Sequence, residues 1–281
     1  RSHFEGQNLM ESGGRTPYQE KTGWVGRAMK LANLQGDGLA LSLPMPLLLR
    51  GIPKNNNYFP GRGKLPRERT LELLRSVYAE SSEDELLEMM NYIKKRKNEE
   101  MMGGTMSHGK RENKNLARQA ATYLRKSDGP RVAVFEVGGF DTHAAQGGVD
   151  GTHTKCLVEM DEIINNLKDN LQEAYKDTII LTVTEFGRTI KQNGGNGTEH
   201  GYGTAIFMAG GLLKKSQVHT DWPGLKRKEL YDGRDLNATI DARSVYASAM
   251  STVFDLDFKR IQKDVFWGED LQDLSDKLFK A

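Results

Sequence analysis

Arg131-Val-Ala-Val-Phe-Glu-Val137 is the stretch that decides the fold. This continuous run of strand-forming residues ends in Gly138-Gly139, which predicts a buried strand. Between Lys155 and Leu171 the apolar residues recur at steps of three and four, which predicts an amphipathic helix. Two more apolar runs, 178–183 and 205–209, predict a second and a third strand. A strand, a helix and a strand in this order indicate parallel pairing and therefore an α/β fold.

The N-terminal half is more helical in pattern. Ser82-Glu-Asp-Glu85 has the spacing of a capping box and predicts the start of a helix, and a second helix is expected over 116–124. Segments 55–63 and 103–109 are rich in Gly, with Asn and Pro in the first, which predicts loops.

Composition restricts the class of protein. The 281 residues include 40 basic and 38 acidic ones, without a basic segment interleaved with aromatic residues, which argues against a nucleic-acid partner. The single cysteine, Cys156, excludes an internal disulfide and a cysteine-based zinc site. No run approaches the roughly 18 apolar residues of a membrane span. Because the chain starts at Arg1, an export signal or a first strand could precede it; localisation stays open between exported or periplasmic and cytoplasmic.

Three motifs place metal-ligand types of residue beside the predicted strands. Asp141 and His143 follow the first strand, where open parallel sheets hold their ligands. Glu185 follows the second strand, and Glu199-His200 precedes the third. Carboxylate and imidazole ligands together suit a divalent metal, which we expect to be zinc, manganese, magnesium or calcium.

Each of these residues also has an ordinary structural interpretation. Asp141 could cap the next turn and leave His143 exposed on the surface. Glu185 could form an ion pair with Arg188, three residues later, and Glu199 could be a surface charge.

Several spaced motifs resemble one known family. Gly-Gly-Phe-Asp-Thr-His143, Glu-Phe-Gly-Arg-Thr189 and Gly-Thr-Glu-His-Gly201 are followed by Trp-Pro-Gly-Leu225 and Thr-Ile-Asp-Ala-Arg-Ser-Val-Tyr246. Together they resemble the domain-of-unknown-function family 1501 over essentially the whole chain. That family is grouped with the alkaline phosphatase-like superfamily of phosphatases, sulfatases and cofactor-independent phosphoglycerate mutases.

The resemblance implies a single alkaline phosphatase-like domain over 1–281, N-terminally incomplete, with a doubly wound, mainly parallel sheet flanked by helices. Residues 50–115 would form a helical cap or insert. A two-metal site is implied, in which Asp141, His143 and His200 bind one metal and Glu185 stands where the superfamily has a further ligand. This chain has Thr184 and Glu199 where the family usually has Ser and Asp, which puts direct ligation by Glu199 in doubt.

The same resemblance suggests a nucleophile. Ser2, followed by His-Phe-Glu-Gly-Gln-Asn-Leu-Met-Glu, resembles the nucleophile-bearing turn of the mutases, although it also fits a plain helix cap. Arg188 could hold an oxyanion or form a structural pair with a carboxylate. Cys156 lacks the Cys-x-Pro-x-Arg pattern of type I sulfatases, which argues against formylglycine chemistry.

Other residues fit structural roles. Asp241 is expected to cap the helix that bears Tyr246, and His108, His153 and His219 are expected at the surface.

Two functions follow as expectations. The first is a metal-dependent hydrolase of phosphate or sulfate esters, acting on a small-molecule or glycan anionic ester. The second is a non-catalytic binding or structural protein that retains the fold.

Overall fold

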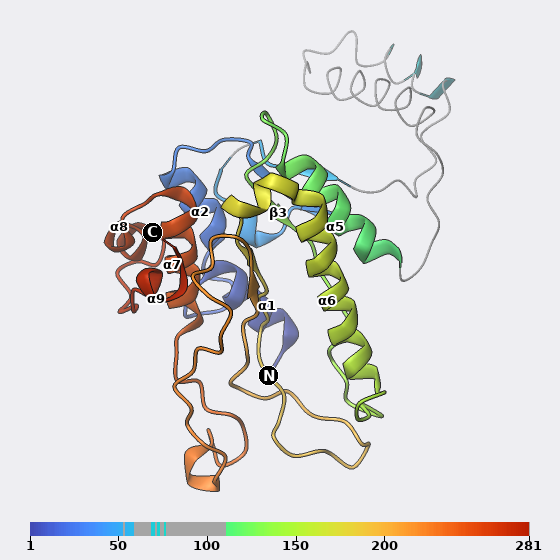
Figure 1. Ribbon diagram of the computed structural model, residues 1–281, viewed down its shortest axis with the longest axis vertical. Coiled ribbons are helices and arrows are strands. Elements are labelled where there is room, and N and C mark those ends of the chain that lie inside the picture. The colour runs from blue at the N-terminus through green and yellow to red at the C-terminus, as the bar shows by residue number, and fades with distance from the viewer. Residues whose placement is uncertain (53, 59–68, 71, 74–75, 77–110, 281) are drawn as a thin grey trace. The chain divides into compact units, whose positions relative to one another are not determined.

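The computed structural model describes residues 1–52, 54–58, 69–70, 72–73, 76 and 111–280 (Figure 1). Residues 1–58 and 113–281 form one compact unit, and the second unit, 59–112, lies almost wholly outside the described residues. The predicted helix from Ser82, the loop 103–109 and His108 fall there, and the helical cap over 50–115 stays a prediction.

A three-stranded parallel sheet lies at the centre of the first unit. Its strands are β1 (Gly38–Leu41), β2 (Asn56–Tyr58) and β3 (Val132–Val134), in the order β2-β1-β3. Leu39 of β1 is in register with Asn56 on one side and with Ala133 on the other. The expected strand at 131–137 is therefore present, although only its first half is in the hydrogen-bonded ladder.

Two expectations about the strands are wrong. The segment 178–183 does not pair in parallel with β3: β4 (Ile180–Leu181) pairs antiparallel with β5 (Met208–Ala209), in a separate two-stranded sheet. Residues 56–58, expected in a loop, form β2, because pairing with the buried β1 outweighs the weak strand propensity of asparagine. The fold is therefore a mixed α/β fold, of which the parallel part is small.

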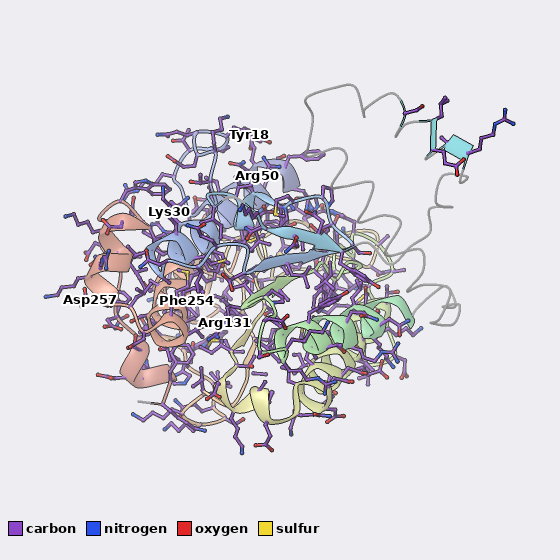
Figure 2. The ribbon with its side chains drawn as sticks, turned by 90° about the horizontal axis from the view of Figure 1, so that it is seen from above. Tyr18, Lys30, Arg50, Arg131, Phe254 and Asp257 are labelled. Carbon is purple, nitrogen blue, oxygen red and sulfur yellow. The ribbon has the colours of Figure 1, made fainter. Side chains whose placement is uncertain are left out.

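Helices cover both faces of the strands (Figure 2). The helices α5 (Arg111–Leu124) and α6 (Thr152–Leu171) pack against Leu39 and Leu41. On the other face, α2 (Trp24–Leu31) and α7 (Ala242–Phe254) share a cluster with Ala40, because successive residues of a strand point to opposite faces. The predicted helices at 116–124 and 155–171 are confirmed by α5 and α6.

The remaining helices either contribute to the hydrophobic cluster that contains Ala40 or lie at the surface. They are the helices α1 (His3–Ser12), α8 (Phe258–Asp264) and α9 (Ser275–Leu278), and the 3-10 helices η1 (Leu47–Leu49), η2 (Gln172–Asp177) and η3 (Arg227–Glu229). None of the described helices combines the length and the apolar character that a membrane crossing requires.

Candidate metal centre

Three histidines converge on the carboxylate of Asp141. The Nε2 atoms of His143 and His200 lie 3.0 and 3.1 Å from Oδ1 of Asp141, and Nε2 of His3 lies 3.1 Å from Oδ2. The two nitrogens of His143 and His200 are 3.0 Å apart. Potential ligand atoms of His3, Asp141 and His200 all lie within 4.8 Å of one another, close enough that the group could hold a metal ion.

The other ring nitrogen of each histidine has a separate acceptor. Nδ1 of His3 lies 2.7 Å from Oε1 of Glu185, and Nδ1 of His143 lies 2.9 Å from Oε2 of Glu199. Nδ1 of His200 lies 2.8 Å from the carbonyl oxygen of Arg1. Metal-binding histidines are usually oriented in this way, by a carboxylate or a carbonyl that accepts the proton of the second nitrogen.

Four separate segments bring these residues together. His3 is the first residue of α1, Asp141 and His143 follow β3, Glu185 follows β4, and His200 lies in the loop before β5. The backbone segments run very close to each other: a Cβ atom at Gly197 would lie 2.2 Å from the carbonyl carbon of His143. Only glycine fits there, which explains why the motif before Glu199 begins with it.

Arg188 also contacts Asp141, at the oxygen that faces His143 and His200. Its Nη1 donates to Oδ1 of Asp141, its Nε donates to Oγ1 of Thr198 at 3.0 Å, and its Nη2 donates to the Thr198 carbonyl. The structural pair considered for Arg188 is thus present, but its partner is Asp141, whereas Glu185 contacts His3 instead.

The charges explain the directions of the pKa shifts. The hydrogen bond with Glu185 raises the pKa of His3. Burial by itself raises the pKa of Asp141, but the hydrogen bonds from Arg188 and His3 lower it to about 2. A hydrogen bond from Asn193 is the main cause of the lowered pKa of Glu199. Asp141 and Glu199 are therefore ionised at neutral pH, and Asp141 is the carboxylate that pairs with the Arg188 guanidinium.

Ser2 occupies the N-cap position of α1, next to His3. It has extended backbone angles, but its side chain makes no capping hydrogen bond. Its exposed hydroxyl therefore does not cap the helix.

The expectations for the other polar residues have mixed outcomes. Asp241 caps α7 by accepting from the backbone of Arg243 at 2.9 Å, as expected. His219 pairs with Gln217 in a polar loop. His153 is only half-exposed: its ring packs edge-on against Phe140, and its Nδ1 is buried without a described partner.

His3 is the member of the cluster that sequence reasoning missed. It sits 138 residues from Asp141 and 182 from Glu185, so no local spacing connects them. The available signal was its place directly after the candidate nucleophile Ser2, at the start of a helix.

The spacing of these atoms fits a small cation. Ligands at about 2.1 Å from a tetrahedral zinc ion are about 3.4 Å apart, and the nitrogen–oxygen distances here are 3.0 and 3.1 Å.

The chain was compared with known proteins. No curated protein matches it, and no solved structure matches it. The family model described as "Protein of unknown function (DUF1501)" matches residues 8–263, which include Asp141, His143 and His200. The chain therefore belongs to the DUF1501 family.

Proposed function

We propose that this protein is a metal-dependent hydrolase of phosphate or sulfate esters. The observation that supports a bound metal is the orientation of the histidine ring nitrogens. Each Nδ1 faces an oxygen that can only accept, so in a neutral ring the proton is on Nδ1 and Nε2 carries a lone pair. In neutral His143 and His200 these lone pairs face each other and Oδ1 of Asp141. His3, whose pKa is raised, instead donates to Oδ2 of Asp141 when it is protonated. A divalent cation at this point would turn the repulsion into ligation.

The donor set favours zinc among the metals considered. Imidazole nitrogens suit Zn²⁺, whereas Mg²⁺ and Ca²⁺ prefer oxygen ligands throughout. His3, Asp141 and His200 would hold the ion and leave a position open for the ester, and His143 lies beside His200 as a further candidate ligand. In this arrangement Glu185 and Glu199 orient His3 and His143 rather than bind the metal themselves.

The hydrolytic step is assigned to Ser2. A bound metal ion would stabilise an anionic ester and the ionised serine hydroxyl. Ser2 is at the N-terminus of α1, where free backbone N–H groups also favour an anion. Oγ would lose its proton and form a bond to phosphorus or sulfur as the bond to the leaving group breaks, and the leaving alkoxide would take up a proton to become the alcohol. Water would then break the new bond, release the acid and restore the proton on Oγ.

Metal content tests the first half of the proposal. We expect about one equivalent of zinc per chain in the wild-type protein and almost none after His200→Ala. His219→Ala is the matched control, because His219 lies outside the cluster and pairs with Gln217, so it should retain the metal. Equal metal content in all three proteins would show that the cluster is not the site.

Turnover tests the second half. A panel of nitrophenyl and sugar phosphates and sulfates should be hydrolysed by the zinc-loaded protein. Ser2→Ala should lower kcat by at least about 100-fold and leave the metal content unchanged. A zinc-loaded Ser2→Ala protein that is as active as the wild type would remove Ser2 from the mechanism.

One contact favours the alternative, a non-catalytic binding or structural protein. The guanidinium of Arg188 already donates to Oδ1 of Asp141, the oxygen that also faces His143 and His200. This fixed positive charge weakens the attraction between the Asp141 carboxylate and a metal cation. Metal-free protein without turnover of any ester in the panel would favour this second function.

A further inference from the structure

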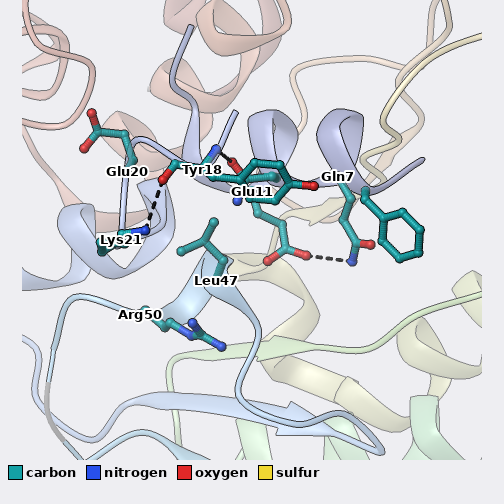
Figure 3. A pocket seen from close by; sticks show the side chains of 9 residues that line it. Gln7, Glu11, Tyr18, Glu20, Lys21, Leu47 and Arg50 are labelled. Carbon is teal, nitrogen blue, oxygen red and sulfur yellow. Dashed lines mark hydrogen bonds between the residues drawn. The ribbon is translucent and has the colours of Figure 1, made fainter. Parts of the chain in front are cut away.

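A cavity of about 380 Å³ lies along the helix that carries His3 (Figure 3). One wall is a face of α1 that includes Phe4, Gln7 and Glu11. Tyr18 lies over Glu11, and Arg50 lies on the side opposite α1.

The cavity begins next to the candidate metal centre. Gln7 is four residues after His3, and residues at this spacing are neighbours on a helix surface. The side chain of Gln7 also reaches across to Glu136, 3.3 Å away, in the segment that leads from β3 to Asp141. The first turn of α1 therefore contributes both to the histidine cluster, through His3, and to the cavity lining, through Phe4.

The lining combines exposed aromatic rings with hydrogen-bonding groups. Phe4 is 78% exposed and Tyr18 is 52% exposed, which leaves apolar ring faces open to a ligand. The lining also includes Gln7, Asn8 and Glu20. The amide nitrogen of Gln7 already donates to Glu11 and Glu136, and the amide oxygen of Asn8 accepts from the backbone of Tyr18. Among the described residues this leaves the Gln7 amide oxygen, the Asn8 amide nitrogen and the Glu20 carboxylate for a ligand. Sugar rings bind to such surfaces, because their C–H faces stack on aromatic rings while their hydroxyls bond to amides and carboxylates.

The charges also suit a hydroxyl-rich ligand. Lys21 donates to the carbonyl of Tyr18 at 3.1 Å, and Arg50 donates to the carbonyl of Met45. Within the described part of the chain, neither cation has a carboxylate within 4.0 Å, so both retain donors for a ligand. Two acidic residues, Glu11 and Glu20, balance them, so the charged residues of the lining carry no net charge.

We propose that this cavity holds the sugar ring of the substrate, so that the ester cleaved at the metal centre is a phosphate or sulfate monoester of a carbohydrate. The inference rests on the proposed hydrolase function for its reaction. The sugar site itself rests only on the cavity.

Kinetics with two kinds of ester test the assignment. Tyr18→Ala and Arg50→Ala should each raise KM for glucose 6-phosphate and glucose 6-sulfate by about tenfold, with kcat nearly unchanged. The same variants should leave both parameters unchanged for 4-nitrophenyl phosphate and sulfate, which lack the sugar. An equal change for both kinds of ester would overturn the proposal. Trp222→Ala and Lys30→Ala, exposed residues outside the cavity lining, are the matched aromatic and cationic controls.

Binding to a glycan array separates this inference from the hydrolase. The wild-type protein and Asp141→Asn should both bind carbohydrates, because Asp141 lies outside the cavity lining, and Tyr18→Ala should lose that binding. This result without any ester hydrolysis would support the sugar site and remove the hydrolase. Wild-type protein that binds no glycan on the array, or Tyr18→Ala that binds as the wild type does, would overturn the sugar site.

Discussion

Individual side chains in the candidate centre have separable roles. The Nε2 atoms of His143 and His200 lie at Oδ1 of Asp141 and that of His3 lies at Oδ2, whereas Glu185 and Glu199 contact the Nδ1 atoms of His3 and His143. A residue that only orients a ligand should change the metal affinity by less than the loss of the ligand itself.

Replacing Glu185 tests this distinction. Glu185→Ala removes the acceptor of the His3 Nδ1 proton, so we expect the zinc dissociation constant to rise by about 10- to 100-fold. Glu185→Gln should show a smaller rise, because the amide oxygen still accepts that proton. Competition with a chromogenic chelator measures both values.

Glu173→Gln is the control for the loss of one carboxylate. Glu173 is exposed and pairs only with Lys176 among the described residues, so the dissociation constant should not change. If Glu185→Ala abolished zinc binding altogether, as a lost ligand would, Glu185 would have to be counted as a ligand.

The sequence motifs contained three of the four residues that the structure brings together at Asp141, but they did not give the arrangement of these residues. Asp141, His143 and His200 stand in recognisable motifs beside the strands, and the structure brings them into contact. The order of the motifs could not show that Glu185 contacts a ring nitrogen of His3, because that contact depends on how α1 docks beside the segment after β4.

Among the helices and strands, the periodicity of apolar residues predicted those elements whose formation depends on nearby residues in the sequence. The 3.6-residue pattern identified α6, and the apolar run at 131–137 identified β3. Gly38–Leu41 was missed because four residues are too few for a pattern, and the pairing of β4 with β5 was missed because hydrogen-bond partners are set by tertiary contacts.

The N-terminus of α7 provides a stability test at this scale. Asp241 accepts from the backbone of Arg243, and its carboxylate also holds the Arg243 guanidinium at 2.7 Å. Asp241→Ala should lower the free energy of unfolding by about 1 kcal/mol at pH 7, chiefly through loss of the cap. Thermal unfolding followed by circular dichroism measures the effect.

The effect of Asp241 should depend on pH. Burial raises the pKa of Asp241, but the Arg243 hydrogen bonds outweigh it and lower that pKa below its ordinary 3.8. The stabilisation is therefore complete above pH 3.8 and is lost as the pH falls through the lowered pKa. The difference between wild type and variant should shrink in acid. Asp150→Ala, at an exposed position, should show no difference at either pH, and a gap that widened in acid would contradict the assignment.

Across the whole described unit, distant parts of the chain meet at one side chain. Arg27 of α2 donates through Nη2 to the carbonyl of Ser12 at 2.6 Å and through Nε to the carbonyl of Val265 at 2.9 Å. Its Nη1 reaches the carbonyl of Thr22, and its guanidinium lies over the ring of Trp267. Burial lowers the pKa of Arg27 to about 10, so it stays charged at neutral pH.

Arg27→Met should therefore destabilise the whole unit rather than one helix. Methionine matches the apolar part of the side chain but leaves three carbonyls without their donor, and we expect a loss of about 3 kcal/mol in the free energy of unfolding. Arg27→Lys should recover only part of this loss, because one ammonium cannot reproduce the planar fork that reaches Ser12, Thr22 and Val265 together.

Urea unfolding, followed by both far-UV circular dichroism and tryptophan fluorescence, measures the loss and shows whether the two signals change together. Arg118→Met on α5, where the arginine contacts only Asn115 among the described residues, should change stability by less than about 0.5 kcal/mol. If Arg27→Met lowered the free energy of unfolding no more than Arg118→Met does, the hydrogen bonds of Arg27 to Ser12 and Val265 would not be important for the stability of the unit.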